Sequence, residues 1–151
     1  MKRKPKKDLR QMTLDEIARF ALRALKRVNP KRVRQGFWMA RPVSDGWEHG
    51  PSEVVTRREP RFLVEPSSCI GCAVGMVLLA DGPRAAADWI YRSERTTHWK
   101  AGHKAHLLLS QLSDVFENTA GPKTGLKATV RELKKIVAQG AEKWTEDCPI
   151  F

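Results

Sequence analysis

Two of the three cysteines stand three positions apart at the start of an apolar run, in the stretch SSCIGCAVGMVLLADG over residues 67–82. A Cys-x-x-Cys pair can form a redox-active dithiol or supply two thiolate ligands to zinc. If Ser68 is the N-cap of a helix, Cys69 occupies the first helical position, where the helix dipole lowers the pKa of a thiol. Cys69 and Cys72 are therefore the first candidates for chemistry.

A zinc site would need two further ligands, and His103 and His106 are candidates for them. Their spacing is not that of a usual zinc module, and the sequence has no second Cys-x-x-Cys. A thioredoxin-like redox centre would need an alternating pattern of strands and helices, which the sequence does not show. We therefore keep a zinc site as a hypothesis, with Cys69, Cys72, His103 and His106 as its ligands. The sequence does not determine whether these residues come together.

A structural interpretation of the same stretch is simpler, and we favour it. If the helix includes Ser68, then Ser68, Cys72, Gly75 and Leu79 lie on one face of it, because they are three or four positions apart. Small residues on such a face let another helix approach closely. A free cysteine behaves as a small buried apolar residue. The run is apolar on nearly every side, which is typical of a helix at the centre of a core.

The distribution of charge carries more information than its total. The chain holds 28 basic and 17 acidic residues, a net charge of +11. Residues 1–34 contain 13 basic and 3 acidic residues, a net of +10, which leaves +1 for the other 117 residues. A basic block confined to one end of the chain favours an anionic partner that docks there, most often a nucleic acid.

The basic block divides into an arm and a helix. Residues 1–11 show no apolar periodicity and are predicted to be a disordered arm. The stretch MTLDEIARFALRALKRVNP then predicts a helix with Thr13 as N-cap and Glu16 as its capping-box partner. Its buried face is expected to consist of Leu14, Ile17, Ala18, Ala21, Leu25 and Val28. The candidate phosphate ligands are Lys2, Arg3, Lys4, Lys6, Lys7, Arg19, Arg23, Lys26, Arg27, Lys31, Arg32 and Arg34.

The remaining segments complete a mainly α fold. Residues 35–66 are rich in glycine and proline and predict a small irregular β element, with strands at 36–40, 53–57 and 61–65. Helices are expected over 84–92 and 104–118, and a last one after Thr124, which would be its N-cap. Leu126, Val130, Leu133 and Val137 would form the buried face of this last helix, which Gly140 closes. We predict one globular domain over residues 12–151, with about five helices around the cysteine- and glycine-containing helix.

Several classes of function lack their signals. The longest apolar stretch is too short to cross a bilayer, and the N-terminus does not resemble a signal peptide, so a cytoplasmic protein without a membrane role is expected. The cysteines would then be reduced. There is no phosphate-binding loop, dinucleotide fingerprint, nucleophile elbow or H-E-x-x-H motif, which favours a protein that is not an enzyme.

Three segments, QGFWMARPVSDG, CIGCAVGMVLLA and ENTAGPKTGLKATVRELKKIV, occur in an order that resembles a family of small uncharacterised proteins of actinobacteria and their phages. The resemblance covers about residues 12–139. The chain departs from the family pattern at Thr119, where the family has Asp, and in its basic arm. The resemblance implies a mostly helical fold with the cysteine helix at its centre, and it implies a phage or high-GC bacterial source, but no activity.

These observations lead to one favoured function and two alternatives. The favoured function is a phage or bacterial accessory protein that binds nucleic acid through the arm and the first helix, without cofactor. The first alternative is a phage-encoded inhibitor that binds an acidic surface of a host polymerase, nuclease or defence complex, steered by the same charge. The second is a thiol or zinc protein built on the Cys-x-x-Cys pair. DNA and RNA are not distinguished by the sequence.

Overall fold

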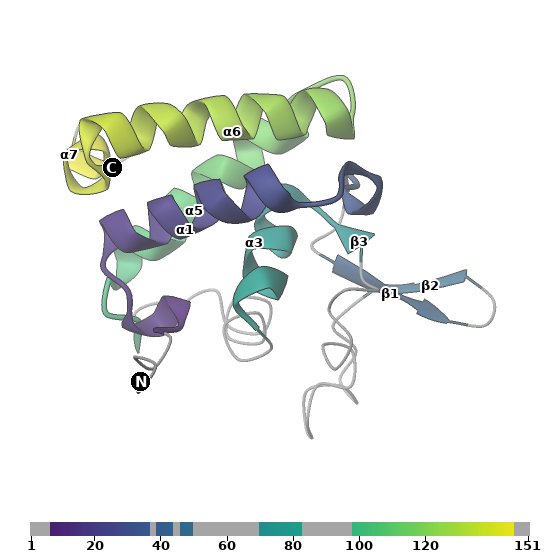
Figure 1. The fold of residues 1–151 in the computed structure, drawn as a ribbon, viewed down its shortest axis with the longest axis horizontal. Helices are drawn as coiled ribbons and strands as arrows, with labels where there is room; N and C mark the ends of the chain where they lie inside the picture. The colour runs from purple at the N-terminus through teal and green to yellow at the C-terminus, as the bar shows by residue number, and fades with distance from the viewer. Residues whose placement is uncertain (1–6, 37–38, 44–45, 50–69, 83–97, 147–151) are drawn as a thin grey trace, which may run out of the picture.

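The computed structural model describes residues 7–36, 39–43, 46–49, 70–82 and 98–146. This part of the chain is mainly helical, as predicted, with a small sheet at one end (Figure 1). Its helices are η1 (Leu9–Gln11), α1 (Leu14–Arg27), η2 (Pro30–Arg32), α3 (Ala73–Asp81), α5 (His103–Glu117), α6 (Pro122–Gln139) and α7 (Ala141–Glu146), where η marks a 3₁₀ helix. Its strands are β1 (Met39–Val43), β2 (Gly46–His49) and β3 (Ile70–Gly71).

The first helix forms as its sequence predicts. The Thr13 hydroxyl accepts a hydrogen bond from the Glu16 N–H, and the Glu16 carboxylate accepts one from the Thr13 N–H, so the capping box is complete. These bonds satisfy donors that would otherwise be unpaired at the start of the helix. The predicted inward face is confirmed, because Leu14, Ile17, Ala18, Ala21 and Leu25 are all buried. Val28, at the C-cap, is half-buried.

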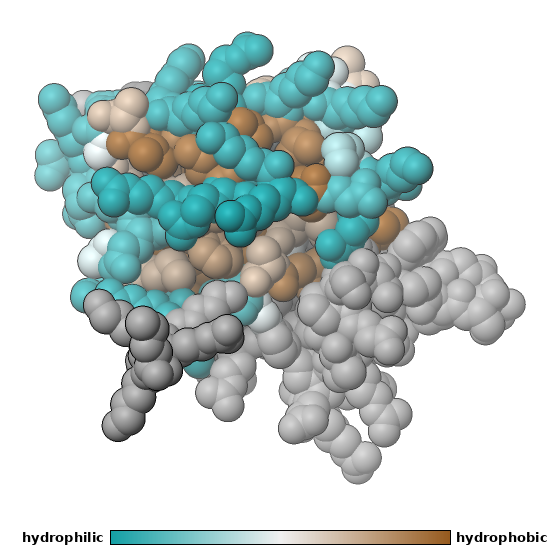
Figure 2. Space-filling view, viewed as in Figure 1, coloured by the Kyte–Doolittle hydropathy of each residue, from teal (hydrophilic) through white to brown (hydrophobic). Residues whose placement is uncertain are grey.

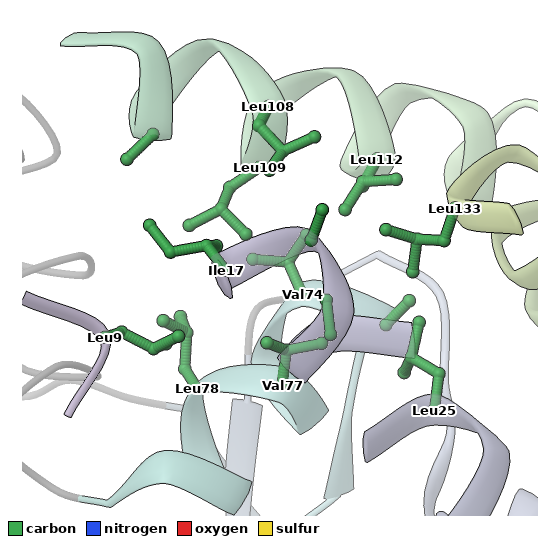
Figure 3. Close-up of a cluster of buried hydrophobic side chains, with 14 of the residues drawn as sticks. Leu9, Ile17, Leu25, Val74, Val77, Leu78, Leu108, Leu109, Leu112 and Leu133 are labelled. Atoms are coloured by element: carbon green, nitrogen blue, oxygen red, sulfur yellow. The ribbon is translucent and has the colours of Figure 1, made fainter. Parts of the chain in front are cut away.

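The core lies where α1, α3, α5 and α6 meet. Seven of the nine residues of α3 are buried, so this helix is enclosed on nearly all sides, as its composition predicts. Figure 3 shows Val74 of α3 between Ile17 of α1 and the leucines of α5, with Val77 and Leu78 below it. The predicted helix over 104–118 is confirmed as α5, in which Leu108, Leu109, Leu112 and Phe116 are buried and Val115 is half-buried.

The start of the cysteine-containing helix differs from the prediction. A helix that begins at Ser68 is wrong, because Ile70 and Gly71 form β3 and α3 begins only at Ala73. The Gly71 carbonyl accepts a hydrogen bond from the Arg34 N–H at 2.8 Å, and Gly71 also bridges to Val33. These long-range backbone contacts override the local preference for a helix. Cys72 is therefore the N-cap of α3 and not part of a stripe within the helix.

The predicted β element is present as a three-stranded antiparallel sheet in the order β2-β1-β3. The strand predicted over 36–40 lies a few residues later, at β1, which pairs with β2 through Val43 and Gly46 at its closed end. On its other side, β1 pairs with β3, so the sheet leads directly into the start of α3. The strands predicted over 53–57 and 61–65 and the helix over 84–92 lie outside the described residues.

The chain is folded before residue 12, so the predicted boundary of the basic arm lies too late. Leu9, in η1, is fully buried, and its N–H donates to the Asp81 carboxylate at the end of α3. The Arg10 carbonyl accepts a hydrogen bond from the Lys100 N–H at 2.7 Å. Asp8 caps η1, and the hydrogen bond from the Arg10 side chain holds the pKa of its carboxyl below the ordinary value. A single buried leucine among charges gives no periodic signal, which is why the sequence does not reveal it.

The last long helix begins earlier and faces the core differently than predicted. α6 starts at Pro122 with Gly121 as its N-cap, so Thr124 is not the cap. Its fully buried residues are Gly125, Thr129, Leu133 and Ile136, whereas Leu126, Val130 and Val137 are half-buried. The predicted face is thus rotated toward solvent at three of its four positions. Gly140 ends the helix with a positive φ of 94°, as predicted, and Trp144 of α7 packs against the core.

α1 and α6 lie side by side and antiparallel (Figure 1). At one end, the Asp15 carboxylate accepts a 2.6 Å hydrogen bond from the Ala141 N–H and so caps α7. At the other end, the Gln35 amide donates to the Phe116 carbonyl and to the Thr119 hydroxyl, both at 3.0 Å. The Gln35 bonds thus tie the segment after α1 to the turn between α5 and α6. Within the described ranges, no helix has the length and apolar composition that a membrane span requires.

Candidate nucleic-acid interface

The predicted basic face of α1 is exposed to solvent. Arg19, Arg23, Lys26 and Arg27 are all exposed and lie opposite the buried face of the helix. None of the four makes an ion pair with another described residue. Both acidic residues of α1 stand in its first turn and have structural partners. All charged residues in the rest of the helix are therefore basic.

The segment after α1 continues this surface on a fixed backbone. The Asn29 side chain accepts a hydrogen bond from the Lys31 N–H and caps η2. Lys31 is exposed, and Arg32 is half-buried. The Arg34 guanidinium donates to the Lys31 carbonyl at 2.6 Å and to the Val33 carbonyl at 2.9 Å, so part of its hydrogen-bonding capacity serves the turn itself.

The N-terminal candidates are only partly described. Lys7 is exposed and forms a 3.3 Å ion pair with Glu16. The pKa of Glu16 is below its ordinary value, mainly because its carboxylate accepts the Thr13 N–H and secondly because of its bond to Lys7. Lys2, Arg3, Lys4 and Lys6 lie outside the described residues.

A second row of cations runs along α6, and the sequence reasoning missed it. The helix carries five basic residues, all exposed, and one acidic residue, the half-buried Glu132. The basic residues are Lys123, Lys127, Arg131, Lys134 and Lys135. Steps of three or four place them on one helical face. This spacing could have been read from the sequence, but acidic residues elsewhere reduce the charge of residues 35–151 to +1 and conceal it.

The fold brings the two basic rows onto neighbouring helices. η2 lies against α6, so the end of the first row also approaches the second. Figure 2 shows two hydrophilic bands, one over α6 and one over α1, separated by an apolar band. The half-buried apolar residues of these helices include Leu22, Leu126, Val130 and Val137. Cations that are almost a hundred positions apart in the chain therefore share one surface.

An open groove of about 620 Å³ lies on the other side of α1, between it and α3. Seven of its lining residues are apolar: Met12, Phe20, Ala24, Val28, Met76, Leu79 and Ala80. Four are basic: Lys7, Arg23, Arg27 and Arg32. The predicted phosphate ligands of α1 therefore fall into two groups. Arg23 and Arg27 line the groove, whereas Arg19 and Lys26 do not.

Cys72 is part of the core and caps a helix. Its side chain is 1% exposed, and its Sγ accepts a 3.3 Å hydrogen bond from the Gly75 N–H at the start of α3. Burial raises the pKa of the Cys72 thiol to about 12, and the negative charge of Glu117 adds to the increase against the opposing Gly75 bond. A thiol with this pKa is protonated and unreactive near neutral pH. Cys69 lies outside the described residues.

The two histidines of the zinc hypothesis lie far from Cys72. His103 and His106 stack on each other with ring centroids 5.7 Å apart at the beginning of α5. The Cys72 thiol instead lies near Glu117, at the other end of α5, and besides burial the charge of Glu117 raises the pKa of the thiol. The helix between these ends is about 21 Å long. Among the described residues, no group of three or more potential ligands could hold a metal ion.

Comparisons with known proteins add no relative: no family model matches the chain, and neither a curated protein nor a solved structure matches it significantly. The resemblance to the actinobacterial and phage family stays a prediction.

Proposed function

We propose that the protein binds nucleic acid through phosphate contacts made by α1, η2 and α6. The supporting observation is the pair of adjacent cationic rows. Between Ile17 and Gly36 the chain has seven basic residues and no acidic one, and α6 adds five more on the neighbouring helix. A nucleic-acid backbone is the common polyanion with charges regular enough to pair with two extended rows of cations.

The dimensions of the surface suit a duplex or a strand laid along the helices. α1 is about 20 Å long and α6 about 27 Å. Duplex DNA carries one negative charge per ~1.7 Å of axis, so ~20 Å of duplex presents about 12 charges. Arginine and lysine contacts to phosphate position a protein without reading the sequence. Binding with little sequence preference is therefore expected.

The test is a titration of fluorescent single- and double-stranded oligonucleotides at several salt concentrations. We expect the logarithm of the affinity to fall linearly with the logarithm of salt concentration, because each neutralised phosphate releases a counterion. The double variant Lys127→Gln/Arg131→Gln should reduce the slope on duplex DNA by about 2. This variant measures the contribution of α6 to binding independently of the N-terminal arm.

The matched control removes two charges elsewhere. Lys100 is exposed outside both rows, and Lys104 is paired with Glu142 at 2.6 Å, so Lys100→Gln/Lys104→Gln should leave the slope unchanged. Equal slopes for the two double variants, or no binding at low salt, would contradict the proposal. The contribution of the arm is measured by deleting residues 1–6 and not further, because Leu9 belongs to the core.

A further inference from the structure

The groove between α1 and α3 has an apolar floor, and apolar residues are not needed to bind phosphates. We define its floor as Met12, Met76 and Leu79, the most buried of its described lining residues, at 7%, 3% and 5% exposure. Phe20 and other half-buried or exposed apolar residues form its sides. Hydrophobic surface of this kind gains free energy when another apolar surface covers it. A ligand that fits the groove must therefore have an apolar side.

The spacing of the groove residues fits a helix as the occupant. Phe20, Ala24 and Val28 follow one another at intervals of four and form a stripe along two turns of α1, about 12 Å. α3 supplies the opposite side through Met76, Leu79 and Ala80. An amphipathic helix binds such a trough through apolar residues at the same intervals. Methionine side chains adapt to the shape of a partner, and two are present here.

The rim of the groove selects the charge of the occupant. Arg23 and Arg27 are exposed on α1, and Lys7 and Arg32 complete a basic lining that, among the described residues, contains no acidic one. Arginine pairs with carboxylates through two parallel hydrogen bonds. A second copy of this chain is a poor occupant because each copy carries a net charge of +11.

We propose that the α1–α3 groove binds an amphipathic helix of another protein, with its apolar side on the groove floor and its flanking carboxylates at Arg23 and Arg27. Apolar burial supplies affinity, and the arginines supply orientation and choice of partner. This site shares Arg23, Arg27 and Arg32 with the phosphate surface, whereas Arg19, Lys26 and the cations of α6 do not line it. The protein would then connect a nucleic acid to a partner protein.

The probe for the test is a designed helical peptide of roughly 16 residues, long enough to form helix. It carries leucines at every fourth position and glutamates on both flanks. Two control peptides have the same leucines with lysine in place of glutamate, or the same composition shuffled so that the leucines share no side. Binding is followed by NMR of the protein labelled at its methionine methyl groups.

Two methionines report on the groove directly. Met12 and Met76 are the methionines among its described lining residues. We expect the glutamate peptide to shift the signals of Met12 and Met76. Neither control peptide should do so. No shift with the glutamate peptide, or equal shifts with the shuffled one, would overturn the proposal.

A matched pair of charge variants on α1 separates the two surfaces. Arg23→Glu/Arg27→Glu should weaken peptide binding by about tenfold or more, because two rim charges are reversed. Arg19→Glu/Lys26→Glu changes the same charge on the same helix away from the groove. It should leave peptide affinity unchanged while lowering oligonucleotide affinity, and circular dichroism checks that both variants fold. Shifts of Met12 and Met76 with an oligonucleotide and not with the peptide would assign the groove to nucleic acid and overturn the proposal.

Discussion

Cys72 shows how a residue with reactive chemistry can serve a structural role. Its thiol is enclosed in the core and accepts the Gly75 N–H, a bond that serine or threonine usually provides at the start of a helix. Burial stabilises the neutral thiol, because an unpaired thiolate would have to lose its hydration. The residue that first suggested a redox or metal centre therefore has the properties of a helix cap inside the core.

The raised pKa of Cys72 predicts a loss of stability in alkali. The unfolded thiol ionises near its ordinary pKa of 9.0, whereas the folded thiol keeps its proton until about pH 12. Between these values the unfolded state binds fewer protons, so the free energy of unfolding falls as pH rises. The slope reaches about 1.4 kcal/mol per pH unit when only the unfolded thiol is ionised.

Urea denaturation of the wild type and of Cys72→Ser from pH 7 to above pH 10 measures this effect. Serine retains a capping oxygen but does not ionise in this range, so the variant should lose less stability in alkali than the wild type. The lysines titrate equally in both proteins, and their contribution cancels in the difference. Parallel stability profiles for the two proteins would show that the Cys72 thiol is not held protonated by the fold.

At Gly125, α6 packs closely against the end of α5. A Cβ atom at this position would lie 2.7 Å from the Phe116 carbonyl oxygen and 2.8 Å from the Thr119 hydroxyl oxygen. The Thr119 hydroxyl is itself fixed by a hydrogen bond to the Phe116 carbonyl at 2.9 Å. The backbone of one helix end and a fixed side chain thus leave no room for a methyl group. This contact sets the position of the whole α5–α6 pair.

Gly125→Ala should therefore destabilise the protein by about 1–3 kcal/mol, although alanine is the better helix former. The measurement is the midpoint of urea unfolding. Gly121→Ala is the matched control, because a Cβ there meets nothing within 4 Å and the residue has an extended backbone with φ 174°. The control should lose less than Gly125→Ala, by about 1 kcal/mol at most, because Gly121 is the N-cap of α6 and alanine caps a helix less well than glycine. A Gly125→Ala variant as stable as this control would contradict the close packing.

At the scale of the whole molecule, the paired basic rows oppose folding. α1, η2 and α6 place many like charges on neighbouring elements, whereas in the unfolded chain those of α1 and α6 are far apart in sequence. Such self-repulsion destabilises a compact state. Proteins that keep destabilising features of this kind commonly use them in function.

Salt should accordingly stabilise the free protein. Ions screen exposed charges, with a Debye length of about 10 Å at 0.1 M salt, so repulsion between the rows weakens. We expect an increase of about 1 kcal/mol, or roughly 2–4 °C in Tm, between low salt and a few hundred millimolar sodium chloride. Lys127→Gln/Arg131→Gln should reduce the increase, as measured by thermal unfolding. A Tm independent of salt in the wild type would contradict the repulsion.

The sequence predicted those elements whose signals are local. The Thr13–Glu16 capping box and the spacing of apolar residues define α1, and Gly140 marks the end of α6. The Pro122 that begins α6 is also a local signal, because proline is favoured in the first turn of a helix. Thr124 has the side chain of an N-cap but lies two residues inside the helix.

Other features depend on contacts that no local pattern reports. Ser68 precedes an apolar run in the way that an N-cap does, yet pairing of Gly71 with the chain near Val33 draws this segment into a sheet. Leu9 is buried because of where Asp81 and its neighbours lie. The groove is likewise a product of tertiary structure, because α1 and α3 are separated by more than forty residues in the chain.

The hydrogen bond from the Ala141 N–H to Asp15 spans 126 positions of the chain and has a consequence during synthesis. At about 5–20 residues per second, a ribosome needs roughly 6–25 s to travel from one residue to the other. For most of that interval α1 has been synthesised, whereas α7 and most of α6 have not. The apolar stripe of Leu14, Ile17 and Leu25 is then without the helix that covers it in the folded protein, and the arginines and lysines stand on the opposite side of α1. Like charges of this kind favour the solubility of an unfinished polypeptide.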